Sequence, residues 1–277
     1  MKLYLTLALF FGFISLVNAQ GASDDARILY EEGEYRQAMR AIDEREKPEN
    51  LMLLADCYHK LEMLDSALTY YYAAEDAGYE EANLFLHRGI CLTTLEITMG
   101  AEDDLLRYYT LEPDDKKVHY YLAAVDYIDN NLREALFHLN KAIEIDPRYM
   151  EAHYLKAAVY MEQNKMISAL ETFEHCLDLK PDFTRSKLNI AIAQYEMLHY
   201  EEADELLTEI VQKEDELLAE ALFYLGNTKL ALHQQDEACE LWKKSELLGD
   251  NYAAEQVLQV CVKGTKRMVR RKTTVSF

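Results

Sequence analysis

The sequence predicts an all-helical fold built from a short repeat of paired helices. Two 34-residue periods and a scarcity of helix-breaking residues predict it. Pro113, Pro147 and Pro181 are 34 residues apart. Alanine recurs with the same spacing at Ala67, Ala101, Ala135, Ala169 and Ala203. Only four of the 277 residues are proline and nine are glycine, which favours long uninterrupted helices. A fixed period of this length is typical of stacked repeats.

The alanines mark the place where the two helices of a pair are expected to cross. Twelve residues before most of them stands another small residue, which is glycine at Gly89 and Gly226. Four residues after them stands a bulky apolar residue, such as Leu105 or Trp242. Helices approach closely only where side chains are small, and the bulky residue fills the adjacent groove. Proline is excluded from helix interiors, so each of the three prolines is expected to end one pair.

Seven repeats and a final capping helix account for residues 20–262. The predicted repeats cover residues 22–48, 49–80, 81–114, 115–148, 149–182, 183–217 and 218–250. One helix pair cannot bury its own apolar face, so neighbouring pairs must supply the core. The last helix, residues 251–262, has no partner repeat and is expected to cap the stack, with Gly264 ending it.

This pattern resembles the tetratricopeptide repeat (TPR) over nearly all of the chain after residue 20. The resemblance implies a right-handed superhelix, an α-solenoid of helix-turn-helix repeats. It also implies a non-enzymatic scaffold that binds a protein or peptide, with the first helix of each repeat lining an inner, concave groove.

Two rows of side chains on these first helices are nominated by the resemblance. The inner row lies one turn before the small crossing residue and consists of Met52, Leu86, Tyr120, Tyr154, Leu188 and Phe223. The outer row lies one turn after it and consists of Tyr30, His59, Thr93, Tyr127, Met161, Tyr195 and Leu230.

The predicted groove is apolar and aromatic. Its candidate residues are Met52, Leu86, Tyr120, Tyr127, Tyr154, Met161, Leu188, Tyr195 and Phe223. Tyrosine and methionine suit recognition because they combine a large contact area with a polar handle or adaptable packing. We expect an extended or helical peptide with apolar anchors to bind there. The alternative is that these side chains only pack against one another.

The N-terminus has the features of an export signal. Lys2 precedes the apolar stretch Leu3 to Leu16, and Val17-Asn18-Ala19 supplies the small residues that a signal peptidase reads. We expect residues 1–19 to be removed before Gln20, and the protein to be periplasmic or secreted. The alternative is a membrane anchor, although the stretch is short for one. No cysteine follows it, which argues against a lipoprotein, and no later apolar run is long enough to span a membrane.

The C-terminal segment, residues 263–277, differs from the rest of the chain in charge. It carries Lys263, Lys266, Arg267, Arg270, Arg271 and Lys272 and no acidic residue. The whole chain has a net charge of −21, which argues against nucleic acid as a partner. We expect this segment to be disordered; the alternatives are an electrostatic arm for an anionic partner or lipid, or docking on the chain's own acidic surface.

Five cysteines are present, so at least one is unpaired within the chain. Cys57 and Cys91 occupy the same place in successive first helices, too far apart to bond. Cys239 and Cys261 lie on either side of the expected turn at 249–250, and an antiparallel hairpin there would bring their sulfurs together. We therefore predict a disulfide that holds the cap to the seventh repeat. The sequence around these cysteines resembles the closing hairpin of exported bacterial repeat proteins, particularly those of Bacteroidota.

No pattern typical of catalysis, a cofactor or a metal was found in the sequence. The eight histidines are scattered, and the 34-residue spacing of His119 and His153 indicates a structural origin. No phosphate-binding loop or nucleophile elbow is present. The leading hypothesis is therefore a binding scaffold of the bacterial envelope. The alternatives are a self-assembling component that forms homo-oligomers, or an adaptor that acts through the basic tail.

Overall fold

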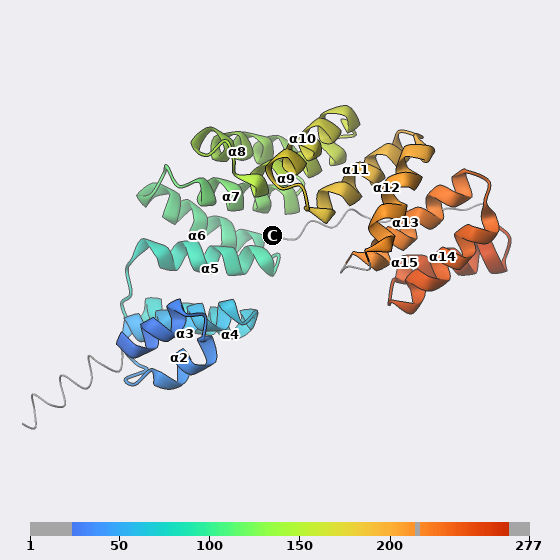
Figure 1. Ribbon diagram of the computed structural model, residues 1–277. Coiled ribbons are helices and arrows are strands. Elements are labelled where there is room, and N and C mark those ends of the chain that lie inside the picture. The colour runs from blue at the N-terminus through green and yellow to red at the C-terminus, as the bar shows by residue number, and fades with distance from the viewer. Residues whose placement is uncertain (1–23, 214–216, 266–277) are drawn as a thin grey trace, which may run out of the picture. The chain divides into compact units, whose positions relative to one another are not determined.

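The computed structural model describes residues 24–213 and 217–265, and every regular element in these ranges is a helix (Figure 1). A first helix covers residues 24–31. The others are α2 (Tyr35–Ala41), α3 (Pro48–Lys60), α4 (Leu64–Asp76), α5 (Ala82–Thr94), α6 (Thr98–Leu111), α7 (Lys116–Ile128), α8 (Leu132–Ile145), α9 (Met150–Glu162), α10 (Met166–Leu179), α11 (Thr184–Glu196), α12 (Tyr200–Gln212), α13 (Leu218–Ala231), α14 (Gln235–Leu247), α15 (Asn251–Gln256) and the π-helix η1 (Val257–Val262).

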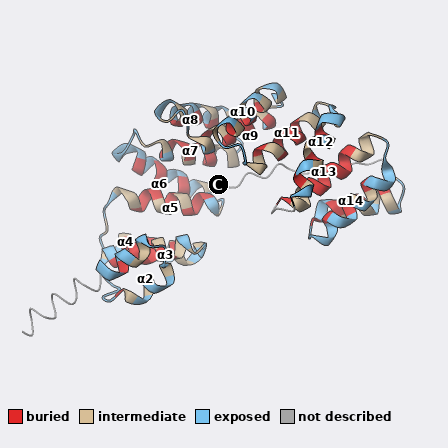
Figure 2. Ribbon diagram, viewed as in Figure 1, coloured by how far each residue is buried: buried red, intermediate tan, exposed pale blue. Residues whose placement is uncertain are grey.

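These helices pack in consecutive pairs within two separately packed units, divided between Asp129 and Asn130. In unit 1, α3 packs on α4 and α5 on α6. In unit 2, α9 packs on α10, α11 on α12 and α13 on α14. Neighbouring pairs contact each other as well, so buried residues lie between the helices of a pair and between pairs (Figure 2). The three repeated prolines each stand two residues beyond a helix end, at α6, α8 and α10.

The close helix crossings predicted from the small residues are present. A Cβ atom added to Gly226 would lie 2.5 Å from Nε1 of Trp242, and one added to Gly89 would lie 2.9 Å from Cγ of Leu105. Both bulky side chains are fully buried. The indole Nε1 of Trp242 also donates hydrogen bonds to the Phe223 carbonyl and to Oδ1 of Asn227, each at 3.1 Å. A buried indole therefore occupies the space that a side chain at residue 226 would need.

The turn inside each of six helix pairs contains a residue in the left-handed region, with φ between 57° and 65°. These residues are Glu62, Glu96, Asn130, Asn164, Leu198 and His233, again about 34 apart. At the first of them, the amide of Glu62 donates to the His59 carbonyl at 2.9 Å and that of Met63 to the Tyr58 carbonyl at 2.9 Å. This is the Schellman pattern that ends a helix and satisfies its last carbonyls. None of the six is glycine, so each turn is held in a conformation that costs its residue free energy.

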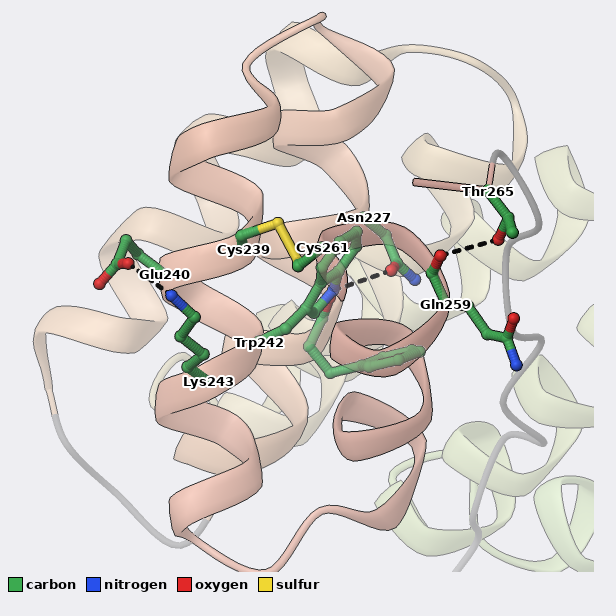
Figure 3. The surroundings of a disulfide bond; sticks show 9 residues. Asn227, Cys239, Glu240, Trp242, Lys243, Gln259, Cys261 and Thr265 are labelled. Atoms are coloured by element: carbon green, nitrogen blue, oxygen red, sulfur yellow. Dashed lines mark hydrogen bonds and ion pairs between the residues drawn. A yellow bond between two sulfur atoms is a disulfide. The ribbon is translucent and has the colours of Figure 1, made fainter. Parts of the chain in front are cut away.

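The C-terminal cap is a hairpin closed by a disulfide. Cys239 of α14 and Cys261 of η1 are bonded, with their Cα atoms 5.9 Å apart (Figure 3). Asp250 begins the returning helix, because its carboxylate accepts from the amides of Tyr252 and Ala253 at 2.9 and 3.2 Å. The returning segment changes from α- to π-helix at Val257, where the sequence predicted one continuous helix. The three other cysteines are free and buried.

Candidate functional site

The inner row of the predicted groove lies in the hydrophobic core. Each of its six side chains is at most 6% exposed. Tyr154 is typical: its ring contacts Phe173 and Phe183, with centroids 5.6 and 5.3 Å apart, and its hydroxyl accepts a hydrogen bond from Asn189 at 2.9 Å. The expectation that these residues form an open groove with apolar anchors is wrong for the inner row, because neighbouring helices cover them.

The outer row is more accessible. Five of its members are half-buried rather than buried: Tyr30, His59, Tyr127, Tyr195 and Leu230. Thr93 is fully buried and Met161 is 7% exposed. Of the nine candidate groove residues, Tyr127 and Tyr195 therefore remain at the surface. Tyr195 and Leu230 lie on α11 and α13, two first helices that contact each other.

A polar cluster in unit 1 includes one outer-row residue, His59. We call Asp56, His59, Tyr71 and His87 the Asp56 cluster. The hydroxyl of Tyr71 donates to Oδ1 of Asp56 at 2.8 Å, and Nδ1 of His87 lies 2.7 Å from the same oxygen. Nδ1 of His59 lies 3.1 Å from the Tyr71 hydroxyl. These contacts join α3, α4 and α5, the two helices of one pair and the first helix of the next.

Burial controls the protonation of this cluster. Burial, followed by the charge of Asp56, raises the pKa of Tyr71 far above its usual range, so its hydroxyl stays protonated. Burial also lowers the pKa of His59, and the nearby imidazole of His87 lowers it further. Tyr30 lies close enough to Asp56 that this carboxylate adds to the effect of burial and raises the Tyr30 pKa.

A buried ion triad fixes the helix that carries His87. The next residue, Arg88, is 3% exposed and makes a two-point contact with Asp104, at 2.6 and 2.8 Å. Its remaining nitrogen donates to Glu75 at 2.6 Å. Burial alone would raise the pKa of Glu75, but hydrogen bonds from Arg88 and Arg107 outweigh it and hold the pKa below its usual range. The triad joins α4, α5 and α6, and so positions the backbone on which His87 stands.

The sequence identified part of this cluster. It placed His59 in the outer row, but neither Tyr71 nor His87 was recognised as a candidate. Asp56 and His87 are 31 residues apart, which is one period less one helical turn. That spacing puts the second side chain beside the first on the adjacent first helix, and it could have indicated the contact.

The remaining candidates lie elsewhere. Lys263 is exposed at the end of the described residues, and Lys266, Arg267, Arg270, Arg271 and Lys272 lie outside them. His119 and His153 have the structural role that their spacing indicated. Nε2 of each ring donates to the carbonyl of the proline six residues earlier, at 3.2 and 3.0 Å.

One pocket of about 560 Å³ lies in unit 1, beside the loop that joins α4 to α5. Its walls include Tyr79, Tyr108 and four glutamates. Both tyrosine hydroxyls are engaged, with Asn83 at 3.1 Å and Asp115 at 2.7 Å. The glutamates are exposed, so this is a solvated depression. Within the described ranges, no three His, Cys, Asp or Glu side chains are grouped to hold a metal, and no helix has the length and apolar character needed to span a membrane.

Stacked helix pairs with a row of accessible side chains along their first helices define a repeat scaffold, the kind of protein that acts by binding. Comparison with known proteins gives the repeat its name. Family models described as TPR repeat and Tetratricopeptide repeat match residues 124–164 and 151–183. The helix pairs within residues 124–183 thus match the tetratricopeptide repeat.

Solved structures agree on the fold. A tetratricopeptide repeat protein from Parabacteroides merdae has a TM-score of 0.68 at 18% identity, covering 87% of this chain and 97% of its own. YrrB, a TPR protein, has a TM-score of 0.52 at 24% identity, covering 60% and 88% of the two chains. At these identities the likeness concerns the fold.

A curated relative matches over a shorter stretch. It is a UDP-N-acetylglucosamine–peptide N-acetylglucosaminyltransferase of Giardia intestinalis, 28% identical over 82 residues. The match covers 30% of this chain, and the chain spans 6% of the length of that enzyme.

Proposed function

We propose that this protein is a non-enzymatic scaffold that binds a peptide or an extended protein segment along its outer row. The observation that supports it most is the difference between the two rows. The inner-row side chains are buried by packing against neighbouring helices, whereas several outer-row side chains are half-buried in both units. Half-buried tyrosine and leucine provide contact area at low entropic cost because packing already restricts them.

The structural neighbours support binding as the general mode of action. The structure of YrrB is described as having an unusual peptide-binding site. Another structural neighbour, with a TM-score of 0.71 at 13% identity, is the APC/C hetero-tetramer Cut9-Hcn1. Neither partner is transferred to this chain. What the neighbours support is that this fold acts through protein contacts.

We further propose that the protein works outside the cytoplasm, in the periplasm or after secretion. The signal-like residues 1–19 support it, although they lie outside the described residues. The disulfide between Cys239 and Cys261 supports it independently, since such bonds persist mainly in oxidising compartments. The basic segment after Lys263 has a separate proposed role, the attraction of anionic surfaces.

Selection of peptides from a random display library on the purified protein tests the binding proposal. We expect selected peptides to bind a Tyr195→Ser/Leu230→Ser variant at least tenfold more weakly, because it removes apolar contact area from the outer row of unit 2. The matched control is Phe137→Ser/Ile167→Ser, which removes apolar side chains that are 58% and 66% exposed on second helices.

Circular dichroism checks that both variants fold. Equal loss of binding in both variants, or no loss in either, would place binding away from the outer row. Failure to select any peptide from several independent libraries would argue against a peptide-binding function.

A further inference from the structure

The hydrogen bonds of the Asp56 cluster determine which nitrogen of each histidine carries the proton. Tyr71 has one hydroxyl hydrogen, and it donates this to Asp56. The Tyr71 oxygen can therefore only accept from Nδ1 of His59. Oδ1 of the ionised Asp56 likewise only accepts, so Nδ1 of His87 must donate to it. Both imidazoles, when neutral, are then protonated at Nδ1.

This arrangement leaves Nε2 of both rings as a bare acceptor. No described residue hydrogen-bonds either Nε2 atom. The rings are within reach of a ligand, because the side chain of His87 is 34% exposed and His59 is half-buried. The carboxylate of Asp56 between them is 14% exposed. The cluster thus presents acceptors and one negative charge, and every donor hydrogen in it is already used.

We propose that Asp56, His59 and His87 form a subsite for a cationic hydrogen-bond donor, the side chain of a lysine or arginine in the bound peptide. An ammonium or guanidinium group carries only donors, which complements a site that offers only acceptors. Tyr30 is half-buried and near enough to Asp56 to interact with its charge, and an aromatic ring near a carboxylate favours cations. This inference rests on the proposed peptide-binding function and names the chemistry of its partner at unit 1.

The same geometry makes binding sensitive to pH. Protonation of His59 replaces its Nε2 lone pair with an N–H and adds a positive charge that repels the ligand. The other charged or titratable groups facing His59 are Asp56, which favours its protonation, and Lys60 and His87, which oppose it. Tyr30 and Tyr71 have raised pKa values and stay neutral. Binding of a basic peptide is therefore full above the lowered pKa of His59 and decreases as the pH falls through that pKa.

Library selection at pH 8 and pH 5.5 tests the subsite, with random dodecapeptides as the probe. We expect the peptides enriched at pH 8 to contain lysine or arginine at one shared position, and to bind at least tenfold more weakly when norleucine replaces that residue. They are also expected to bind at least tenfold more weakly to Asp56→Asn, and to bind more weakly at pH 5.5 than at pH 8. The matched control, Asp115→Asn, changes another aspartate of unit 1 that accepts a tyrosine hydroxyl, and should bind normally.

Three results distinguish failure of the proposed cationic subsite from failure of the proposed peptide-binding function. Enrichment of peptides without a shared basic residue, or equal binding to Asp56→Asn, would overturn the subsite and leave peptide binding intact. No enrichment at all would overturn both. Long-range ¹H–¹⁵N spectra of labelled histidines at pH 8 test the premise without any ligand. Nδ1–H tautomers for His59 and His87 support it, and an Nε2–H tautomer for either one would overturn it.

Discussion

At the scale of single residues, close packing explains why particular positions are small. Gly226 faces an indole that is fully buried and bonded to two acceptors, so the ring has little room to retreat. Gly89 faces the side chain of Leu105, which can shift by rotation. Both positions carry the small residue that the repeat requires, but the side chains that face them differ in how far they can move to make room for a Cβ atom.

We expect Gly226→Ala to destabilise unit 2 by about 2 kcal/mol, because overpacking of a core costs more than alanine gains in helix propensity. Gly100→Ala is the matched control in α6. Its new Cβ would lie 3.4 Å from the nearest side-chain atom, and we expect no loss or a gain of up to about 1 kcal/mol. Denaturant midpoints measure both. A Gly226→Ala protein as stable as the unchanged one would contradict the argument.

At the scale of elements, the helix ends depend on contacts that composition does not reveal. Six turns place a non-glycine residue at positive φ, including Leu198 and His233. Asn130 and Asn164 are of a type that adopts this region readily, whereas Glu62, Glu96 and Leu198 are not. The sequence therefore indicated where helices stop without indicating, at most of these turns, the conformation that stops them. The cap differs: its turn, its cysteines and the expected pairing were all readable from spacing, whereas the change to a π-helix at Val257 was not.

Loss of the cap disulfide should weaken unit 2. The bond links residues 22 apart, and closure of a loop of that size is worth about 3 kcal/mol in the chain-entropy model. We expect reductant to lower the unfolding midpoint and to speed hydrogen exchange in residues 251–262.

A Cys239→Ala/Cys261→Ala variant is the control, because its midpoint should not respond to reductant. Alkylation of all five cysteines in denatured, unreduced protein would show that the bond is absent in solution and contradict the prediction.

At the scale of the whole molecule, charge and compartment belong together. A net charge of −21 favours solubility, because like charges on neighbouring molecules repel one another. The single disulfide and the apolar N-terminal stretch both favour an oxidising location. The two units have separate cores: Met52 and Leu86 lie in that of unit 1, and Tyr154, Leu188 and Phe223 lie in that of unit 2.

We expect the protein recovered from its producing cells to begin at Gln20 and to contain the Cys239–Cys261 bond. Intact-mass and N-terminal peptide analysis of the non-cytoplasmic fraction measures both. A Leu9→Arg variant, which interrupts the apolar stretch, should stay in the cytoplasm with its first residues retained. Unchanged protein found uncleaved in the cytoplasm would contradict export.

The sequence by itself determined the helical class, the repeat period, the crossing residues and the expected partner of each cap cysteine. These depend on spacing along the chain, and a repeating pattern records spacing directly. It nominated Tyr154 and Phe223 as binding residues because their type and register suit a groove. It could not tell a tyrosine at a surface from one enclosed by its neighbours.

Tertiary structure decided which row stays open and which polar groups meet. Burial of the inner row depends on side chains such as Phe173 and Phe183, which come from other helices. The Asp56 cluster likewise needs Tyr71 and His87 to arrive from α4 and α5. The exposure of a side chain and its hydrogen-bond partners depend on several helices at once. They therefore cannot be predicted from the order of residues along the chain alone.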